Sequence, residues 1–118
     1  MNELVPVKMG TPLYLVEADS ICQFTLSEVF MADEPQETLT AIIKKTSFEP
    51  HKDIDNEWLF DVHSYSEAHE IKESSRITND VWYLNFAANT IICLDFNEAK
   101  HSLLLKLDYQ IQEAERYL

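Results

Sequence analysis

The sequence predicts an α+β fold, in which an antiparallel sheet of four to five strands carries a long C-terminal helix on one face. Two observations support this class. Segments of alternating apolar and polar residues fill the middle of the chain, and an apolar stripe at helical spacing follows Asn97. One or two shorter helices complete the expected fold. At 118 residues the chain has the length of one domain, so we expect residues 1–118 to form a single compact acidic unit.

Three segments have the composition of strands. Residues 13–17 form a short apolar run, and the prolines on either side of this region indicate an edge position. Residues 38–48 alternate and are rich in β-branched side chains, which favours a strand. Residues 57–65 place apolar side chains on one face and polar ones on the other, as in a half-buried strand.

Turns depend on Pro, Asn and Asp, because Gly10 is the single glycine. The expected turns lie at residues 9–12, 33–35, 49–51 and 53–56.

Residues 20–31 fit two structures. Their apolar side chains recur at i, i+4, i+7 and i+8 from Cys22, which favours a helix. The alternation of Cys22, Phe24 and Leu26 also fits a strand. We therefore expect a helix here, with a strand as the alternative, and a second short helix near residues 66–74.

The segment 81–96 predicts a β-hairpin. A two-residue loop at 88–89 would place Asp95 on the face that carries the aromatic side chains. A three-residue loop at 87–89, with Asn89 in the left-handed conformation, leaves Asp95 on the other face. We prefer the second register for that reason. It aligns Trp82, Leu84 and Phe86 with Thr90, Ile92 and Leu94.

The C-terminal segment predicts one long helix. After Asn97, the expected cap, no glycine or proline occurs up to Leu118. We expect the apolar stripe of this helix to cover the sheet. The stripe consists of Leu103, Leu104, Leu107, Ile111, Ala114 and Leu118.

Charge excludes several classes of partner. The formal net charge is −12, from 21 acids against nine Lys and Arg. A surface that binds nucleic acid or an anionic membrane needs clustered basic residues, so we expect neither partner.

No stretch resembles a signal peptide or a membrane span, which indicates a cytoplasmic protein. Cys22 and Cys93 are expected to be reduced core residues, with a single disulfide as the alternative.

Catalytic and cofactor motifs are absent from the sequence. A single glycine cannot form a Walker-type loop or a Rossmann fingerprint, which need several. Neither a Gly-x-Ser-x-Gly elbow nor a catalytic-thiol signature occurs. We therefore expect a protein that is not an enzyme and that needs no cofactor.

The one metal-like constellation combines His63 and His69 with Glu67 and Glu70. Its spacing does not suit a site on a single element, so we predict no metal. A metal-dependent enzyme that uses His63 and His69 remains the third hypothesis for function.

The acidic residues are localised, and this predicts a partner. No base occurs between Lys8 and Lys44, a stretch that contains Asp33 and Glu34, and a second cluster follows before Val62. Carboxylates attract basic proteins and can occupy the place of phosphates in a nuclease cleft. The sequence therefore predicts an inhibitor resembling bacterial immunity proteins or antitoxins in surface chemistry, which neutralises a basic partner such as a nuclease toxin. The predicted binding residues are Asp53, Asp55, Glu57, Asp61, Tyr65, Asp33 and Glu34.

A small acidic chaperone or adaptor is the alternative. Such a protein would hold an extended client segment on a sheet edge or on the amphipathic helix, and it would be a dimer. The inhibitor hypothesis requires only a 1:1 complex, so both a monomer and a dimer remain open.

Overall fold

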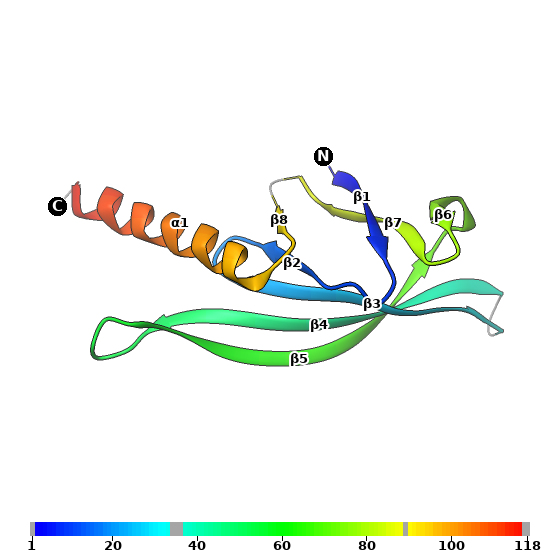
Figure 1. Ribbon diagram of the computed structural model, residues 1–118, viewed down its shortest axis with the longest axis horizontal. Helices are drawn as coiled ribbons and strands as arrows, with labels where there is room; N and C mark the ends of the chain where they lie inside the picture. The colour runs from blue at the N-terminus through cyan, green and yellow to red at the C-terminus, as the bar shows by residue number, and fades with distance from the viewer. Residues whose placement is uncertain (1, 34–36, 89, 117–118) are drawn as a thin grey trace.

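The protein has an α+β fold made of two antiparallel sheets and one long helix (Figure 1). The structure, a computed structural model, describes residues 2–33, 37–88 and 90–116. The larger sheet has the strand order β5-β4-β3-β2-β8, and the smaller has the order β1-β7-β6. The predicted fold class is confirmed. The elements are β1 (Asn2–Lys8), β2 (Leu13–Val16), β3 (Ile21–Ala32), β4 (Thr38–Lys52), β5 (Trp58–Ile71), the 3-10 helix η1 (Glu73–Ser75), β6 (Arg76–Thr78), β7 (Val81–Ala87), β8 (Ile91–Cys93) and α1 (Phe96–Arg116).

Strands β3, β4 and β5 run side by side along the long axis of the molecule (Figure 1). They have 12, 15 and 14 residues. The pairing of β4 with β5 continues without a shift from Leu39 opposite Ile71 to Lys52 opposite Trp58. The strands predicted over 38–48 and 57–65 are therefore present, and both extend further than predicted.

The smaller sheet packs on one face of the larger sheet. Side chains alternate between the two faces of a strand, and Leu15 of β2 lies opposite Cys22 of β3 on this face. Both belong to a cluster that also contains Val7 of β1 and Trp82 of β7. Trp82 is almost fully buried, and the Arg76 guanidinium lies 4.9 Å from its ring centroid. The apolar faces of the two sheets thus cover each other.

Helix α1 packs on the opposite face of the larger sheet. Val16 and Ile21, which are paired neighbours of the residues in the first cluster, point to this side and contact Ala99 and Leu103 of the helix. The ring of Phe96 lies 4.7 Å from the ring of Phe48. Burial of these apolar side chains against the larger sheet holds the first part of the amphipathic helix in place.

The beginning of α1 is capped by Asp95 rather than by the predicted Asn97. The backbone N–H of Glu98 donates to Asp95 Oδ1 at 2.8 Å. This bond satisfies one of the free N–H groups of the first turn. Asp95 is therefore held at the surface by its role as a cap.

Only the first half of α1 is covered by the sheet. Leu103 is buried and Leu107 half-buried, whereas Leu105 and Tyr109 are exposed by 57% and 65%. Ile111, which was predicted to face the core, is 37% exposed. The side chains of Ala114 and Leu118 lie outside the described residues. The helix therefore continues past the sheet that it was expected to cover throughout.

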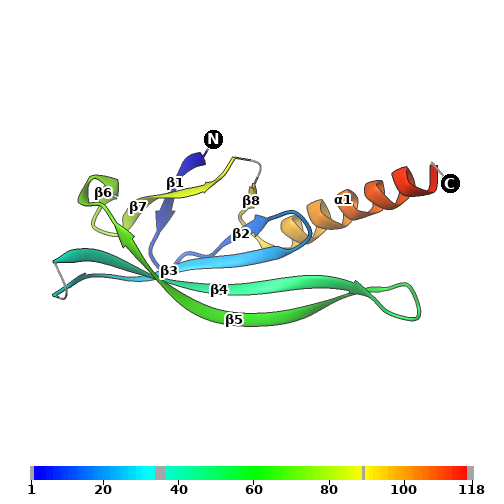
Figure 2. The same cartoon turned by 180° about the vertical axis from the view of Figure 1, so that it is seen from behind.

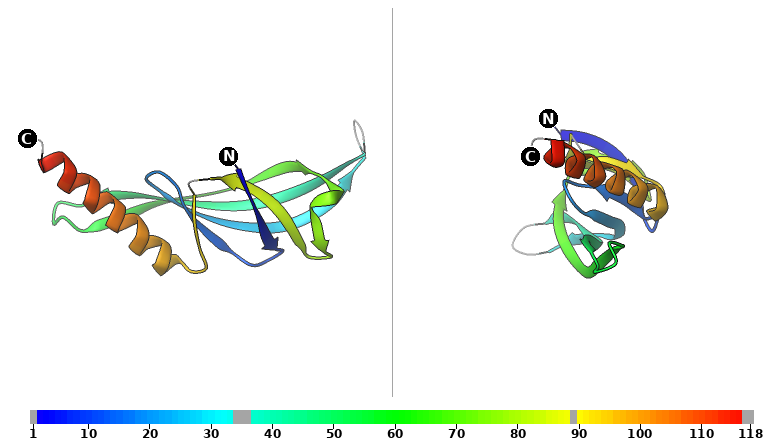
Figure 3. Two further views of the ribbon diagram at one scale, coloured as in Figure 1. Left: turned by 90° about the horizontal axis from the view of Figure 1, so that it is seen from above. Right: turned by 90° about the vertical axis from the view of Figure 1, so that its left-hand side faces the viewer.

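The molecule is elongated, with dimensions of 57 × 27 × 25 Å. Its radius of gyration is 17.2 Å, whereas a compact domain of this length has about 13–14 Å. Seen from behind and from above, α1 lies over the half of the long strands that ends in the β4–β5 turn, and the smaller sheet lies over the other half (Figures 2 and 3). Towards the β4–β5 turn, α1 reaches at least as far along the long axis as the strands do (Figure 1).

The helix predicted over residues 20–31 is wrong, and the alternative strand is present as β3. Cys22, Phe24 and Leu26 are all buried on one face. As a strand between β2 and β4, this segment pairs its backbone on both edges and buries these three side chains together. These contacts decide for a strand, although four apolar residues also have helical spacing.

The helix predicted near residues 66–74 is also wrong. Strand β5 continues to Ile71 because it stays paired with β4, and only Glu73–Ser75 form a short 3-10 helix. Glu67, His69 and Glu70 are therefore strand residues.

The hairpin predicted over residues 81–96 does not form. Strand β7 pairs with β1 and β6, whereas β8 pairs with β2 in the other sheet. Neither proposed register applies, because the two strands belong to different sheets. Their partners come from the distant N-terminal residues.

Two smaller predictions also fail. Strand β2 was expected at an edge but lies between β3 and β8. Residues 49–51 were expected to turn but lie within β4, where Pro50 is opposite Phe60 of β5. Pairing with β3 stops at Phe48, so Pro50 occupies a part of β4 with a partner on one side only, where proline is tolerated.

The turns predicted at residues 9–12 and 53–56 are present. Gly10 adopts a φ of 80°, a backbone conformation that glycine allows and that residues with a side chain rarely adopt. Most of the turn predicted at 33–35 lies outside the described residues. Cys22 and Cys93 are buried free thiols in separate clusters, as predicted.

Candidate functional site

The β4–β5 turn, residues 53–57, forms a well-defined tip at one end of the long strands (Figure 1). The N–H of Asn56 donates to the carbonyl of Asp53, and the N–H of Asp53 donates to the carbonyl of Glu57, both at 2.9 Å. Asp53 Oδ1 accepts the N–H of Ile54 at 2.7 Å. Asn56 has a φ of 64°, in the left-handed region that asparagine tolerates better than most residues. The chain thus closes the hairpin with short polar side chains.

This tip is acidic and carries an exposed apolar side chain. Asp53, Asp55 and Glu57 are all exposed, and Ile54 between them is 95% exposed. From Glu49 to Asp61 the chain has five acids and one lysine, a net charge of −4. That lysine, Lys52, lies 5.0 Å from the ring centroid of Trp58. The tip therefore combines negative charge with an apolar group that its own chain does not cover.

Asp61 and Tyr65, two other predicted residues, lie along β5 behind the tip. Asp61 is exposed, and one of its carboxylate oxygens is 3.5 Å from Nε2 of His51. Tyr65 is opposite Lys45 of β4 and 47% exposed, and the Lys45 ammonium lies 6.0 Å from its ring centroid. Asp61 and Tyr65 lie on the same face of β5.

Asp33 lies far from the tip, and Glu34 lies outside the described residues. Asp33 follows the end of β3 and is exposed. The 15 residues of β4 separate this end of the strands from the β4–β5 turn, a distance of about 50 Å at 3.3 Å per residue. The structure therefore brings Asp53, Asp55 and Glu57 together and leaves Asp33 at the opposite end.

A cleft of about 1020 Å³ between the two sheets was not anticipated from the sequence. Its walls include Cys22 and Phe24 of β3, Ile43 and Lys45 of β4, His69 of β5 and residues 83–87 of β7. Strand β7 has β1 along one edge, but β6 pairs only with Val81 and Trp82 on the other. Within the described ranges, the edge of residues 83–86 that faces away from β1 has no strand partner.

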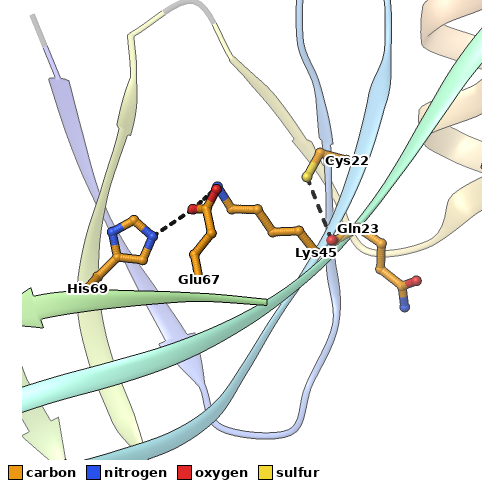
Figure 4. A network of polar contacts seen from close by, with 5 residues as sticks. All are labelled: Cys22, Gln23, Lys45, Glu67 and His69. Carbon is orange, nitrogen blue, oxygen red and sulfur yellow. Dashed lines mark hydrogen bonds and ion pairs between the residues drawn. The ribbon is translucent and has the colours of Figure 1, made fainter. Parts of the chain in front are cut away.

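A polar network lies at the wall of this cleft (Figure 4). Figure 4 shows Lys45 and His69 directed at the same carboxylate, that of Glu67. Lys45 Nζ is 2.9 Å and His69 Nε2 is 2.8 Å from Glu67 Oε2. The three side chains come from two adjacent strands and share the face that the smaller sheet covers.

The network fixes the charges of its members. Burial opposes the ammonium of Lys45, but the hydrogen bond to Glu67 and the charge of that residue outweigh it, so the pKa of Lys45 is raised. The hydrogen bond from Lys45, and then that from His69, lowers the pKa of Glu67. Burial, followed by the charge of Glu17, raises the pKa of the Cys22 thiol. Lys45 is thus a fixed cation at neutral pH, and Cys22 is a protonated thiol.

One signal in the sequence pointed to this network. Along β4, Leu39, Ala41 and Ile43 occupy alternate positions on the covered face, and Lys45 follows at the next such position. A lysine there requires a carboxylate partner. The partner, Glu67, is 22 residues away, and only the β4–β5 register brings it close.

The two histidines of the third hypothesis do not converge. His63 and His69 lie on the same face of β5, six residues apart, which corresponds to about 20 Å. Zinc ligands each lie about 2 Å from the ion. Among the described residues, no group of three or more His, Cys, Asp or Glu side chains has a metal-binding arrangement.

Comparisons of the chain with family models, with curated proteins and with solved structures found no match. No helix in the described part of the chain is both long and apolar enough to cross a membrane.

Proposed function

We propose that this chain is a non-enzymatic binding protein that inhibits a basic partner by placing the β4–β5 tip in a cationic cleft. The observation that carries the proposal is the composition of the tip. Three carboxylates surround Ile54, which is 95% exposed. Interfaces commonly have this arrangement, with a central apolar anchor that becomes desolvated and a polar rim around it.

The shape of the tip supports an inhibitory role. A turn closed by two backbone hydrogen bonds loses little conformational freedom on binding, which favours affinity. Its carboxylates can occupy the positions that substrate phosphates occupy in a nuclease. The partner class in this proposal is therefore a basic nuclease, such as a toxin, that the chain meets in the cytoplasm. The relationship to immunity proteins and antitoxins is one of surface chemistry.

The second half of α1 adds apolar surface at the same end of the molecule. Figures 1 and 3 show the helix extending towards the end that carries the β4–β5 turn. Tyr109 and Ile111 of this half are exposed, and so is Leu105 just before it. A partner that contacts both elements would bury this surface together with the tip.

The test is an inhibition and binding assay with purified basic nucleases, beginning with any that is encoded beside this chain. Reversing Asp53, Asp55 and Glu57 to Lys is expected to lower the association rate by about 10- to 1000-fold at low salt. Reversing Asp19, Glu28 and Asp80, which are exposed outside the tip and outside α1, makes the same change in net charge and serves as the control. Equal losses of association rate in both triple variants would show that the net charge of the chain, and not the tip, determines binding.

An adaptor that binds an extended client segment is the second candidate function. The observation in its favour is the cleft beside the unpaired edge of β7, where an added strand could pair with residues 83–86. Apolar walls from Phe24 and Phe86 would accept alternate side chains of the client. Lys45 would supply a fixed positive charge.

The two candidates differ in which residues matter. A client held in the cleft would lose affinity when Phe86 is changed to Lys and would show little dependence on salt. An inhibitory complex would be insensitive to that change and would weaken as salt rises. The Phe86→Lys variant and the tip variant, measured side by side, decide between them.

A further inference from the structure

Strand β5 presents a long unpaired edge. It is the last strand of the larger sheet and pairs with β4 along its whole length, from Trp58 to Ile71. Within the described ranges, no strand pairs with its other edge. None of its side chains is fully buried. In Figure 1, β5 runs along the lower border of the long strands, and no other element is drawn beyond it.

This edge lacks the usual protection against pairing. Natural edge strands carry lysine, proline or bulges that prevent a second strand from adding. Neither lysine nor proline occurs between Trp58 and Ile71. The register with β4 has no shift, whereas β3 and β4 shift between Leu26 and Glu28. The ionisable residues that β5 does carry are acids and histidines, and their order along the strand determines which register a second copy would favour.

The sequence of β5 is self-complementary about Tyr65. When two copies are placed antiparallel with Tyr65 opposite Tyr65, each residue i lies opposite residue 130 − i of the other copy. Each of the two acids nearest the centre then meets a histidine, and aliphatic residues meet aliphatic residues. The matched pairs are Asp61 with His69, His63 with Glu67, Leu59 with Ile71, Val62 with Ala68, and Ser64 with Ser66, and the one mismatched pair is Phe60 with Glu70.

Other registers lose this match. Centring the pair on Ser64 places Asp61 opposite Glu67, two like charges. Centring it on Ser66 places His63 opposite His69. A parallel in-register pair would place each acid opposite itself. The antiparallel register about Tyr65 is therefore favoured by charge, in the way that registers are set in sheets with polar edges.

We propose that β5 is a homodimerisation edge, and that a second copy of this chain adds to it in the register centred on Tyr65. The two larger sheets then form one continuous sheet with a two-fold axis at Tyr65. Contacts within each chain are compatible with this pairing. Glu67 already holds Lys45 and His69, and the second copy's His63 approaches the same carboxylate. The dimer does not rest on the proposed function, because it concerns the outer edge of β5 and leaves the turn at 53–57 outside the paired segment.

The register is tested by single-cysteine cross-linking. In the proposed dimer the two Tyr65 positions are directly opposite, with Cα atoms about 4.5–5.5 Å apart, a separation that a disulfide spans. Tyr65→Cys is therefore expected to give a covalent dimer under mild oxidation. Val62→Cys is the matched control, since its two copies lie about 20 Å apart along the strands. The native Cys22 and Cys93 are buried and would not compete.

A charge exchange provides a second, independent test. His69→Glu alone places two carboxylates opposite each other at two sites of the dimer, and Asp61→Lys alone removes the carboxylate that faces His69 at both sites; each is expected to raise the dissociation constant of the dimer about tenfold. The double variant restores opposite charges and is expected to dimerise like the wild type. Residues 61 and 69 are about 26 Å apart within one chain, so such a rescue can only arise between chains. Asp108→Lys, on the exposed side of α1, makes the same charge change as Asp61→Lys and should have no effect.

The readout is the molar mass by analytical ultracentrifugation across a concentration series, with circular dichroism as a check on folding. The expected result is a reversible species of twice the 13.7 kDa chain mass, with the cross-linking and rescue pattern above. A wild-type chain that stays monomeric at high concentration would overturn the proposal. So would a dimer in which Tyr65→Cys does not cross-link or in which the double variant is not rescued.

Discussion

The contrast between Leu103 and Leu105 shows how burial assigns roles to similar residues on α1. Leu103 is fully buried against the sheet, whereas Leu105 is 57% exposed. We expect Leu103→Ala to lower the free energy of unfolding by about 2–5 kcal/mol, because it leaves a cavity beside Val16 and Ile21. Leu105→Ala should change it by less than about 0.5 kcal/mol. Urea denaturation of both variants checks the position of the helix, and equal effects would mean that α1 packs on another face.

The ion pair of Lys45 with Glu67 predicts a change in acid stability. The pKa of Glu67 is lowered in the folded chain by the hydrogen bonds from Lys45 and then His69. A carboxyl with a lowered folded pKa stabilises the fold above its unfolded pKa, and this contribution disappears as the pH falls through the folded value. Because Glu67 is partly exposed, the effect is screened and small.

The variant that tests this is Glu67→Gln. It should have a slightly lower Tm than the wild type at pH 7, and the difference should disappear as the pH falls from about 5 through the lowered pKa of Glu67. Thermal melts over this range measure it. A difference that stays constant, or that grows as the pH falls, would show that the Glu67 carboxylate is not stabilised by its neighbours.

Individual side chains were only partly predictable. Trp58, Phe60 and Val62 were correctly expected to share a face, since strand alternation is a local property. The pairing of Lys45 with Glu67 was not foreseen, because it depends on a register between two strands. From the sequence, Asp95 was used only to choose between two hairpin registers. In the structure its carboxylate caps the beginning of α1.

At the scale of elements, the β4–β5 turn depends on the left-handed conformation of Asn56. Replacing Asn56 by Gly should preserve stability, because glycine adopts a φ of 64° without strain. Asn56→Val should cost about 1–2 kcal/mol, since a β-branched residue is strained there. Chemical denaturation of the two variants compares them. Similar stability for both would indicate that the turn rearranges readily.

Elements were predicted well where a pattern is local and poorly where strands choose distant partners. The strands over 38–48 and 57–65 and the C-terminal helix follow from alternation and from helical spacing. The apolar residues of 20–31 fit both periods, and pairing with β2 and β4 decides for a strand. The expected hairpin at 81–96 failed because its halves pair with β1 and β2, a choice that local turn chemistry cannot reveal.

The shape of the whole molecule is itself testable. Small-angle X-ray scattering on the Asp61→Lys variant, at concentrations below its raised dissociation constant where it is monomeric, should give a radius of gyration near 17.2 Å. A value of about 13–14 Å, that of a compact domain, would mean that the long hairpin folds back on the body. The wild type at high concentration should give a larger value than the variant.

The acidic site was partly visible in the sequence, because the residues of one turn are neighbours both in sequence and in space. Asp53, Asp55 and Glu57 are together for that reason. Asp33 belongs to the other end of β4, and no local pattern gives the length of the strand that separates them. The exposure of Ile54 could not be predicted either, since it depends on no other element covering this turn.

The central claim is that the tip at residues 53–57 is the part of this protein that its partner covers. Amide hydrogen exchange, measured with and without a basic nuclease that the chain inhibits, tests this most directly. We predict that protection on binding is centred on residues 53–57, with a weaker effect in the second half of α1. Protection confined to residues 83–87, with an unchanged tip, would contradict the claim and assign binding to the cleft.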